Sequence, residues 1–164
     1  MRELLPKAQT IHVAAPFRIS GASPLFSPLL LADEKPGPDK AEEAAASAPD
    51  PLKDGSLDAR EIMNLSLAAR VAVLSDGSAM SMRDAADDTV LIYWSWRTAG
   101  VPYLLLSRWP ADASVSDRFL AAFHRGLQGG ETPPSAFRAA QESIRRSDAT
   151  IAPHHWAGWV LIGR

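Results

Sequence analysis

The stretch Val71-Ala-Val-Leu-Ser-Asp-Gly-Ser78 decides the fold of this chain. Four aliphatic residues, two of them β-branched, end in a polar turn that contains a glycine. This pattern is typical of a buried parallel strand, whose carboxyl end delivers polar groups to a site just outside the sheet. We therefore expect an α/β domain whose functional groups follow this strand.

The composition of the chain narrows its class. Its 164 residues suffice for one domain with a sizeable core, and 46% hydrophobic with 22% charged residues is typical of a soluble globular protein. The net charge of −2 gives no electrostatic reason to expect nucleic acid or an anionic membrane as partner. No apolar run approaches the ~20 residues of a membrane span. Because the first residues also lack the apolar segment of a signal peptide, we expect a cytoplasmic location.

The chain contains no cysteine, which excludes disulfides, thiolate metal sites and a cysteine nucleophile. The adjacent pair His154-His155 is a poor metal site if it is extended, because neighbouring residues of a strand point to opposite faces. Asp84, Asp87 and Asp88 are explained more simply by helix capping and solvation than by a carboxylate site. We expect neither a metal nor a cofactor.

Short apolar runs alternate with helical segments along the chain. Strands are predicted at residues 10–15, 29–31, 71–74, 101–107 and 156–163, and helices at 57–65, 89–98, 114–128 and after Thr132. This alternation implies three layers, with helices on both faces of a mostly parallel sheet. Residues 32–56 carry charge, alanine and proline with little to bury, so we expect a mobile surface insertion there.

Capping residues mark the helix starts, at Asp58, at Asp88 and at Ser114 or Ser116. The run Val90–Trp96 is apolar almost all round, so its helix is expected to be buried rather than amphipathic. Gly100 is expected to end that helix, since glycine adopts the backbone conformation that terminates helices.

The order of these landmarks resembles the CHAT domain, a bacterial relative of caspases and separases. The matching stretches are Ile11–Pro16, Ser27–Ala32, Leu57–Ile62, Val71–Ser75, Ala99–Trp109, Phe119–Leu127, Ala136–Gln141 and His155–Gly163. The resemblance implies a single CHAT-like domain over residues 1–164 with a caspase-like fold. It covers the C-terminal portion of the family's domain, so the first strand–helix unit is expected to be missing. The strand at 10–15 would then form an open edge.

In the CHAT family the chemistry belongs to a histidine–cysteine dyad, in which a thiolate attacks a peptide carbonyl and the imidazole handles the proton. On the family's motifs, Pro16 stands at the position of the catalytic histidine and Gly77 at that of the cysteine. Neither residue can be a base or a nucleophile. The resemblance therefore implies a degenerate pseudo-peptidase that has kept a binding or scaffolding role.

A peptide cleft around Gly77 remains an expectation. Trp109 leaves its strand at the same end of the sheet and is expected to wall that cleft. The other candidate lining residues are His12, Ser75, Asp76, Ser78 and Arg108. For His12 we also expect an ordinary structural role within its strand. The expected partner is a protein or peptide, either a helical-repeat region of the kind that accompanies this family or a second copy paired through the open edge.

Two alternatives stay open. The first is a hydrolase that uses Ser78 or Ser75 as nucleophile, or an enzyme completed by another chain. Such an enzyme needs a base within reach of the serine. His12 lies four residues before position 16, where the resemblance places the catalytic histidine. The second alternative is a truncated gene product without independent function.

Overall fold

The computed structural model describes residues 4–15, 28–30, 56–75, 85–109, 112–147 and 152–163. Four strands form its main sheet in the order β1-β4-β5-β6. They are β1 (Thr10–Val13), β4 (Val71–Leu74), β5 (Tyr103–Ser107) and β6 (Trp159–Gly163). The first three run parallel and β6 runs antiparallel to β5, which confirms the mostly parallel sheet. All four β4 residues are buried, as the opening run predicts.

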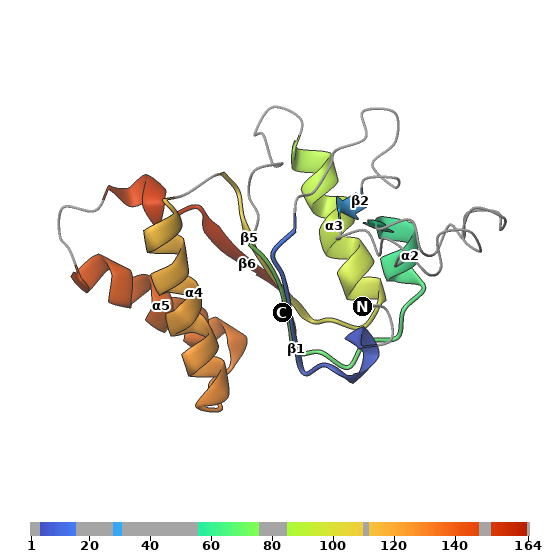
Figure 1. The fold of residues 1–164 in the computed structure, drawn as a ribbon, viewed down its shortest axis with the longest axis horizontal. Coiled ribbons are helices and arrows are strands. Elements are labelled where there is room, and N and C mark those ends of the chain that lie inside the picture. The colour runs from blue at the N-terminus through green and yellow to red at the C-terminus, as the bar shows by residue number, and fades with distance from the viewer. Residues whose placement is uncertain are drawn as a thin grey trace, which may run out of the picture.

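Helices cover both faces of this sheet (Figure 1). The helices α2 (Ala59–Met63) and α3 (Ala85–Thr98) lie on one side, and α4 (Ala113–Gln128) and α5 (Pro133–Ser147) lie on the other. Two short 3-10 helices, η1 (Leu5–Lys7) and η5 (Pro153–His155), precede β1 and β6. The predicted three-layer α/β architecture is therefore confirmed. Within the described ranges no helix has the length and apolar character needed to cross a bilayer.

The alternation of side chains along the strands divides the interior into two cores. Ala72, Leu104 and Leu106 belong to the core on the α2 and α3 side, which also holds Trp96. The intervening strand residues Val71, Val73 and Leu105 belong to the core that α4 and α5 complete. Because both faces of β4 and β5 are buried, these strands read as continuous apolar runs rather than alternating ones.

A small second sheet pairs β2 (Pro28–Leu30) antiparallel with β3 (Ser56–Asp58). The predicted strand at 29–31 is thus one arm of a separate pair and not part of the main sheet. Residues 31–55, most of the predicted insertion, lie outside the described residues, and Ser56 is already the first residue of β3.

Asp58 caps α2 as predicted. Its carboxylate accepts a hydrogen bond from the Glu61 amide at 2.9 Å, and the Glu61 carboxylate accepts one from the Asp58 amide at 2.9 Å. This reciprocal arrangement is a capping box, which satisfies two free donors at the start of the helix. The helix is shorter than the predicted range 57–65, because residues up to Asp58 are paired with β2 instead.

The helix α3 differs from its prediction in two ways. It begins at Ala85, so Asp88 lies inside the helix rather than capping it. It is also not buried all round, because Val90 and Trp94 are each 54% exposed. A helix that lies on a sheet buries only one stripe. The buried Ile92 and Trp96 occupy that stripe, and positions 90 and 94 fall on the opposite side.

The cap of α4 is Asp112, not Ser114 or Ser116 as predicted. Its carboxylate accepts hydrogen bonds from the Val115 amide at 3.1 Å and from the Ser114 hydroxyl at 2.5 Å. The hydrogen bonds from Ser114 and Val115 lower the pKa of the Asp112 carboxyl, so it stays ionised at the positive end of the helix. One side of this helix packs into the core, where Phe119 and Phe123 are fully buried.

Candidate functional site

The carboxyl ends of three parallel strands define the candidate site. The register pairs Val13 with Leu74 and Leu74 with Leu106, so β1, β4 and β5 end side by side. The Ser75 amide extends this ladder by donating a hydrogen bond to the Val13 carbonyl at 3.1 Å. Open α/β sheets bind ligands at this kind of edge. The site was predicted after the carboxyl end of β4, and the structure shows that the carboxyl ends of β1 and β5 lie beside this end.

The two positions that the family resemblance aligns with the dyad follow these strands at equal distance along the sequence. Pro16 lies three residues beyond Val13, and Gly77 lies three residues beyond its partner Leu74. Pro16, Gly77 and the predicted lining residues Asp76 and Ser78 lie outside the described residues. The described strands show that Val13 and Leu74, the last strand residues before these two segments, lie side by side.

Trp109 lies at this same end and is held by the segment before β6. Its indole Nε1 donates a hydrogen bond to the His154 carbonyl at 2.7 Å. Its ring lies so close to Gly158 that a Cβ there would be 2.9 Å from two ring atoms. The buried Ser107 hydroxyl also donates to the Trp109 carbonyl at 2.5 Å. These contacts fix the Trp109 side chain at the end of β5, and its indole N–H is already used in a hydrogen bond.

Arg108 is exposed beside Trp109. Its guanidinium carbon lies 5.7 Å from the centroid of the Trp109 ring, which is within the range of a cation–π contact. The Arg108 amide donates to the Gly158 carbonyl at 2.9 Å, so β5 and β6 stay connected past their last paired residues. The side chain therefore lies at the surface beside the ring of Trp109.

His12 does not share the face of its strand neighbours. Ile11 and Val13 are buried in the core beneath α2 and α3, so His12 faces the α4 side. Its Nδ1 lies 3.1 Å from Nε2 of His124 in α4, and the two ring centroids are 5.0 Å apart. Sequence reasoning missed this pairing, because the two residues are 112 positions apart.

We expect the His12–His124 pair to make stability depend on pH. Burial lowers the pKa of both imidazoles, and for His12 the proximity of His124 adds to the effect. Because the folded pKa values lie below the unfolded value of about 6.5, the unfolded chain binds protons first as the pH falls. The free energy of unfolding should therefore be constant above pH 7.5, decline below about pH 6.5 and level off below the lowered values.

Urea unfolding of metal-free protein between pH 5 and pH 8 measures this dependence. The double variant His12→Gln, His124→Gln should show a smaller decline over this range than the natural chain. Equal pH profiles for the two proteins would contradict the assignment to this pair.

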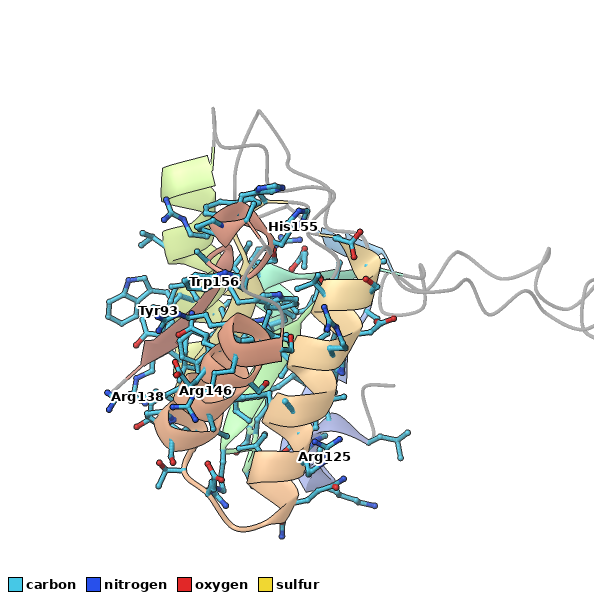
Figure 2. All side chains as sticks on the ribbon, turned by 90° about the vertical axis from the view of Figure 1, so that its left-hand side faces the viewer. Tyr93, Arg125, Arg138, Arg146, His155 and Trp156 are labelled. Atoms are coloured by element: carbon cyan, nitrogen blue, oxygen red, sulfur yellow. The ribbon has the colours of Figure 1, made fainter. Side chains whose placement is uncertain are left out.

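His154 and His155 are not extended, contrary to the sequence expectation. They lie in η5, and their ring centroids are only 3.7 Å apart. Figure 2 shows His155 and Trp156 in the segment that precedes β6, and the Arg145 guanidinium of α5 lies 5.8 Å from the Trp156 ring centroid. Among the described residues, no group of three or more potential ligand side chains is arranged to hold a metal.

A separate cavity of about 360 Å³ lies at the other end of β5. Tyr103 begins that strand and pairs with Gly163, the last residue of β6. Phe137 and Arg138 of α5 complete much of the lining, and Arg138 is labelled in Figure 2. Since its lining includes the first residue of β5 rather than the last, the cavity is distinct from the candidate site.

The sheet order, the layers and the strand ends define an α/β domain of caspase-like type. The profile of the CHAT domain family matches residues 1–164, so the chain belongs to the CHAT domain family. The family suggested by the sequence motifs is therefore confirmed over the full length of the chain.

Two curated mammalian proteins are similar to this chain. Tetratricopeptide repeat protein 28 of Homo sapiens is 29% identical over 113 residues, and that of Mus musculus is 30% identical over 113 residues. In both cases the match covers 69% of this chain and 5% of the relative. The chain thus corresponds to a small part of each of these repeat proteins.

Proposed function

We propose that this chain is a catalytically inactive CHAT-type pseudo-peptidase domain that binds protein or peptide segments. The observation that carries the proposal is the presence of Pro16 and Gly77 at the two dyad positions. A proline side chain has no titratable group, and glycine has no side chain. Because the chain has no cysteine, no other thiol can replace the nucleophile.

The described geometry supports the correspondence with the dyad. A thiolate and an imidazole must come within hydrogen-bond reach for the base to activate the nucleophile. Positions 16 and 77 follow adjacent, in-register strands by the same number of residues, which is compatible with such a pair. The correspondence therefore rests on strand register as well as on motif similarity.

Two features support a binding role. Among the described strands β1 lies at the edge of the main sheet, and such an edge offers backbone donors and acceptors to an added strand. Two similar proteins are named for tetratricopeptide repeats, and solenoids of such repeats form extended protein-binding surfaces. The proposed partner is therefore an extended peptide, a helical-repeat region or a second copy, in the cytoplasm.

A serine hydrolase is the second candidate, because Ser75 directly follows β4 at the candidate site and Ser78 lies nearby in the sequence. A serine nucleophile needs an imidazole or equivalent base within hydrogen-bond reach. His12, on the neighbouring strand, lies against His124, and among the described residues no hydrogen bond joins it to Ser75. This placement favours the binding role over the hydrolase.

The proposal is tested by incubating the purified chain with an immobilised, mass-encoded peptide library and with a fluorophosphonate probe. We expect a subset of peptides to be retained without cleavage, and no labelling by the probe. A known serine hydrolase is the positive control. Cleavage or labelling that Ser78→Ala or Ser75→Ala abolishes would establish the hydrolase instead, and a library that is neither retained nor cleaved would refute the binding role.

A further inference from the structure

The His12–His124 pair brings two imidazole nitrogens together at the edge of the domain. Nδ1 of His12 and Nε2 of His124 are 3.1 Å apart, although they come from β1 and α4. The view in Figure 2 has α4 in front of the sheet, with Arg125, the residue after His124, labelled. His12 is exposed as a residue although its ring is partly desolvated against His124, and His124 is half-buried, so the pair lies at the protein surface.

We propose that His12 and His124 form a two-histidine binding site for a divalent transition-metal ion such as Cu²⁺, Ni²⁺ or Zn²⁺. The ion joins the edge strand β1 to α4 through Nδ1 of His12 and Nε2 of His124. Water or a side chain from a bound partner fills the remaining positions. His12 lies within β1, four residues before position 16 in the sequence, and faces the α4 side of the sheet.

The separation of the two nitrogens matches the requirement of a shared ion. Imidazole nitrogens bind Zn²⁺ at about 2.0–2.1 Å, so two of them in tetrahedral geometry lie roughly 3.3–3.4 Å apart. The observed 3.1 Å corresponds to a slightly narrower angle at the metal, about 100°. The distance between the nitrogens needs to change by only a few tenths of an ångström, and the two rings must also turn so that both nitrogen lone pairs point at the ion.

The protonation state of the pair is also suitable. Burial lowers the pKa of both imidazoles, so both are neutral at pH 7.5. A neutral imidazole binds a metal through the nitrogen that carries no proton. If one of the facing nitrogens carries a proton in the metal-free protein, that proton transfers through water to the other nitrogen of the same ring. Binding then needs no net proton release and no co-reactant.

The chemistry of the donors indicates which ions bind. Two imidazoles favour Cu²⁺ over Ni²⁺ and Zn²⁺, following the general order of affinity, whereas Mg²⁺ and Ca²⁺ prefer oxygen ligands. The described residues supply these two ligands and no larger ligand group. We therefore expect a site of moderate affinity with positions open to water.

The test is a calorimetric titration of the metal-free, full-length chain with CuCl₂ at pH 7.5, followed by electron paramagnetic resonance of the bound Cu²⁺. We expect His12→Gln and His124→Gln each to weaken binding by about tenfold or more, since loss of a supporting partner alone costs 10–100-fold. The resonance should show two coordinating nitrogens in the natural chain and one in either variant. MgCl₂ should give no binding heat.

His154→Gln is the matched control, because it removes one imidazole of the other close histidine pair. It should leave the affinity unchanged. Unaltered binding in His12→Gln, or loss of binding in His154→Gln, would overturn the proposal. Circular dichroism of the metal-free variants confirms folding, and the exposed His12→Gln gives the answer alone if His124→Gln is unstable. Since the peptide-binding assay needs no metal, failure of this site leaves the proposed function untouched.

Discussion

Introducing Pro16→His together with Gly77→Cys is expected to create a thiol that iodoacetamide alkylates about tenfold faster at pH 6.5 than the thiol of Gly77→Cys alone. The reason is that β1 and β4 are adjacent and parallel, with Val13 paired to Leu74. Both substituted positions follow that pair by three residues. An imidazole at position 16 should therefore lie close enough to stabilise a thiolate at position 77.

The size of the effect follows from two opposing trends. A free cysteine has a pKa of about 8.5, so only ~1% is thiolate at pH 6.5. Lowering the thiol pKa by two to three units makes most of the thiol anionic. The larger thiolate fraction alone would raise the alkylation rate up to a hundredfold. The more stable thiolate is also a weaker nucleophile, which removes roughly one power of ten. About a tenfold net gain remains.

Ser78→Cys combined with Pro16→His is the matched control for this experiment. It places the same thiol one residue beyond the dyad position, so its alkylation should be accelerated less. Rates are measured by quenched mass spectrometry between pH 5.5 and pH 8.5. If the thiol at position 77 reacts no faster with the histidine than without it, Pro16 and Gly77 do not correspond to the dyad.

The elements that the sequence predicts best are those whose signal is local and strong. The run at 71–74 becomes β4, the glycines after residue 128 end α4, and Thr132 caps α5 through the Ser135 amide at 3.4 Å. For the two helix ends the deciding contact is made within a few residues along the chain, and for β4 the local apolar run is itself the signal. The order of such elements, with the family resemblance, was enough to give the layers and the parallel sheet.

The errors come from contacts between distant segments. No local pattern shows that residues 56–58 pair with 28–30, and this pairing shortened the predicted helix at its start. The exposure of Trp94 has a similar cause, because an apolar run does not reveal which of its sides the sheet will cover. The local sequence shows how hydrophobic a helix is, but packing against distant segments decides which of its side chains are buried.

The candidate site divides in the same way. The end of β4 was predictable, since a polar, glycine-containing segment follows its apolar run in the sequence. The partner of His12 was not, because His124 lies in a helix 112 residues away, and its place beside the β1 edge depends on how α4 crosses the sheet. One signal was available: alternation in β1 places His12 opposite Ile11 and Val13.

Replacing Gly100 by alanine is expected to lower the free energy of unfolding by about 3 kcal/mol, a large part of the 5–15 kcal/mol typical of a domain. Gly100 connects α3 to β5 with φ +110°, a conformation that costs other residues about 1–3 kcal/mol. A Cβ there would lie 2.6 Å from the Leu67 carbonyl oxygen. This contact adds to the backbone strain.

The crowding at Gly100 cannot be relieved cheaply, because the backbone on both sides is tied down. The Leu67 amide donates to the Ala99 carbonyl at 2.7 Å, and the Val101 amide donates to the Trp96 carbonyl at 3.0 Å. Moving Leu67 away from a new methyl group would break the first of these bonds. Moving the turn would disturb Val101, which is 1% exposed in the core. The strain should therefore appear as lost stability rather than as a local adjustment.

Gly129→Ala is the matched control, since this glycine also follows a helix but has φ −71° and no atom closer than 3.4 Å to a new Cβ. Its effect should stay within about 0.5 kcal/mol, or be slightly stabilising because alanine restricts the unfolded chain. Urea unfolding of both variants and the natural chain gives the comparison. Equal effects of the two substitutions would mean that the α3–β5 turn relaxes freely. A loss of stability several times larger for Gly100→Ala than for Gly129→Ala would instead show that the contact between Leu67 and the α3–β5 turn is rigid. Segment 64–70 leads into β4 and this turn leads into β5, so the contact fixes the starts of the two central strands of the sheet.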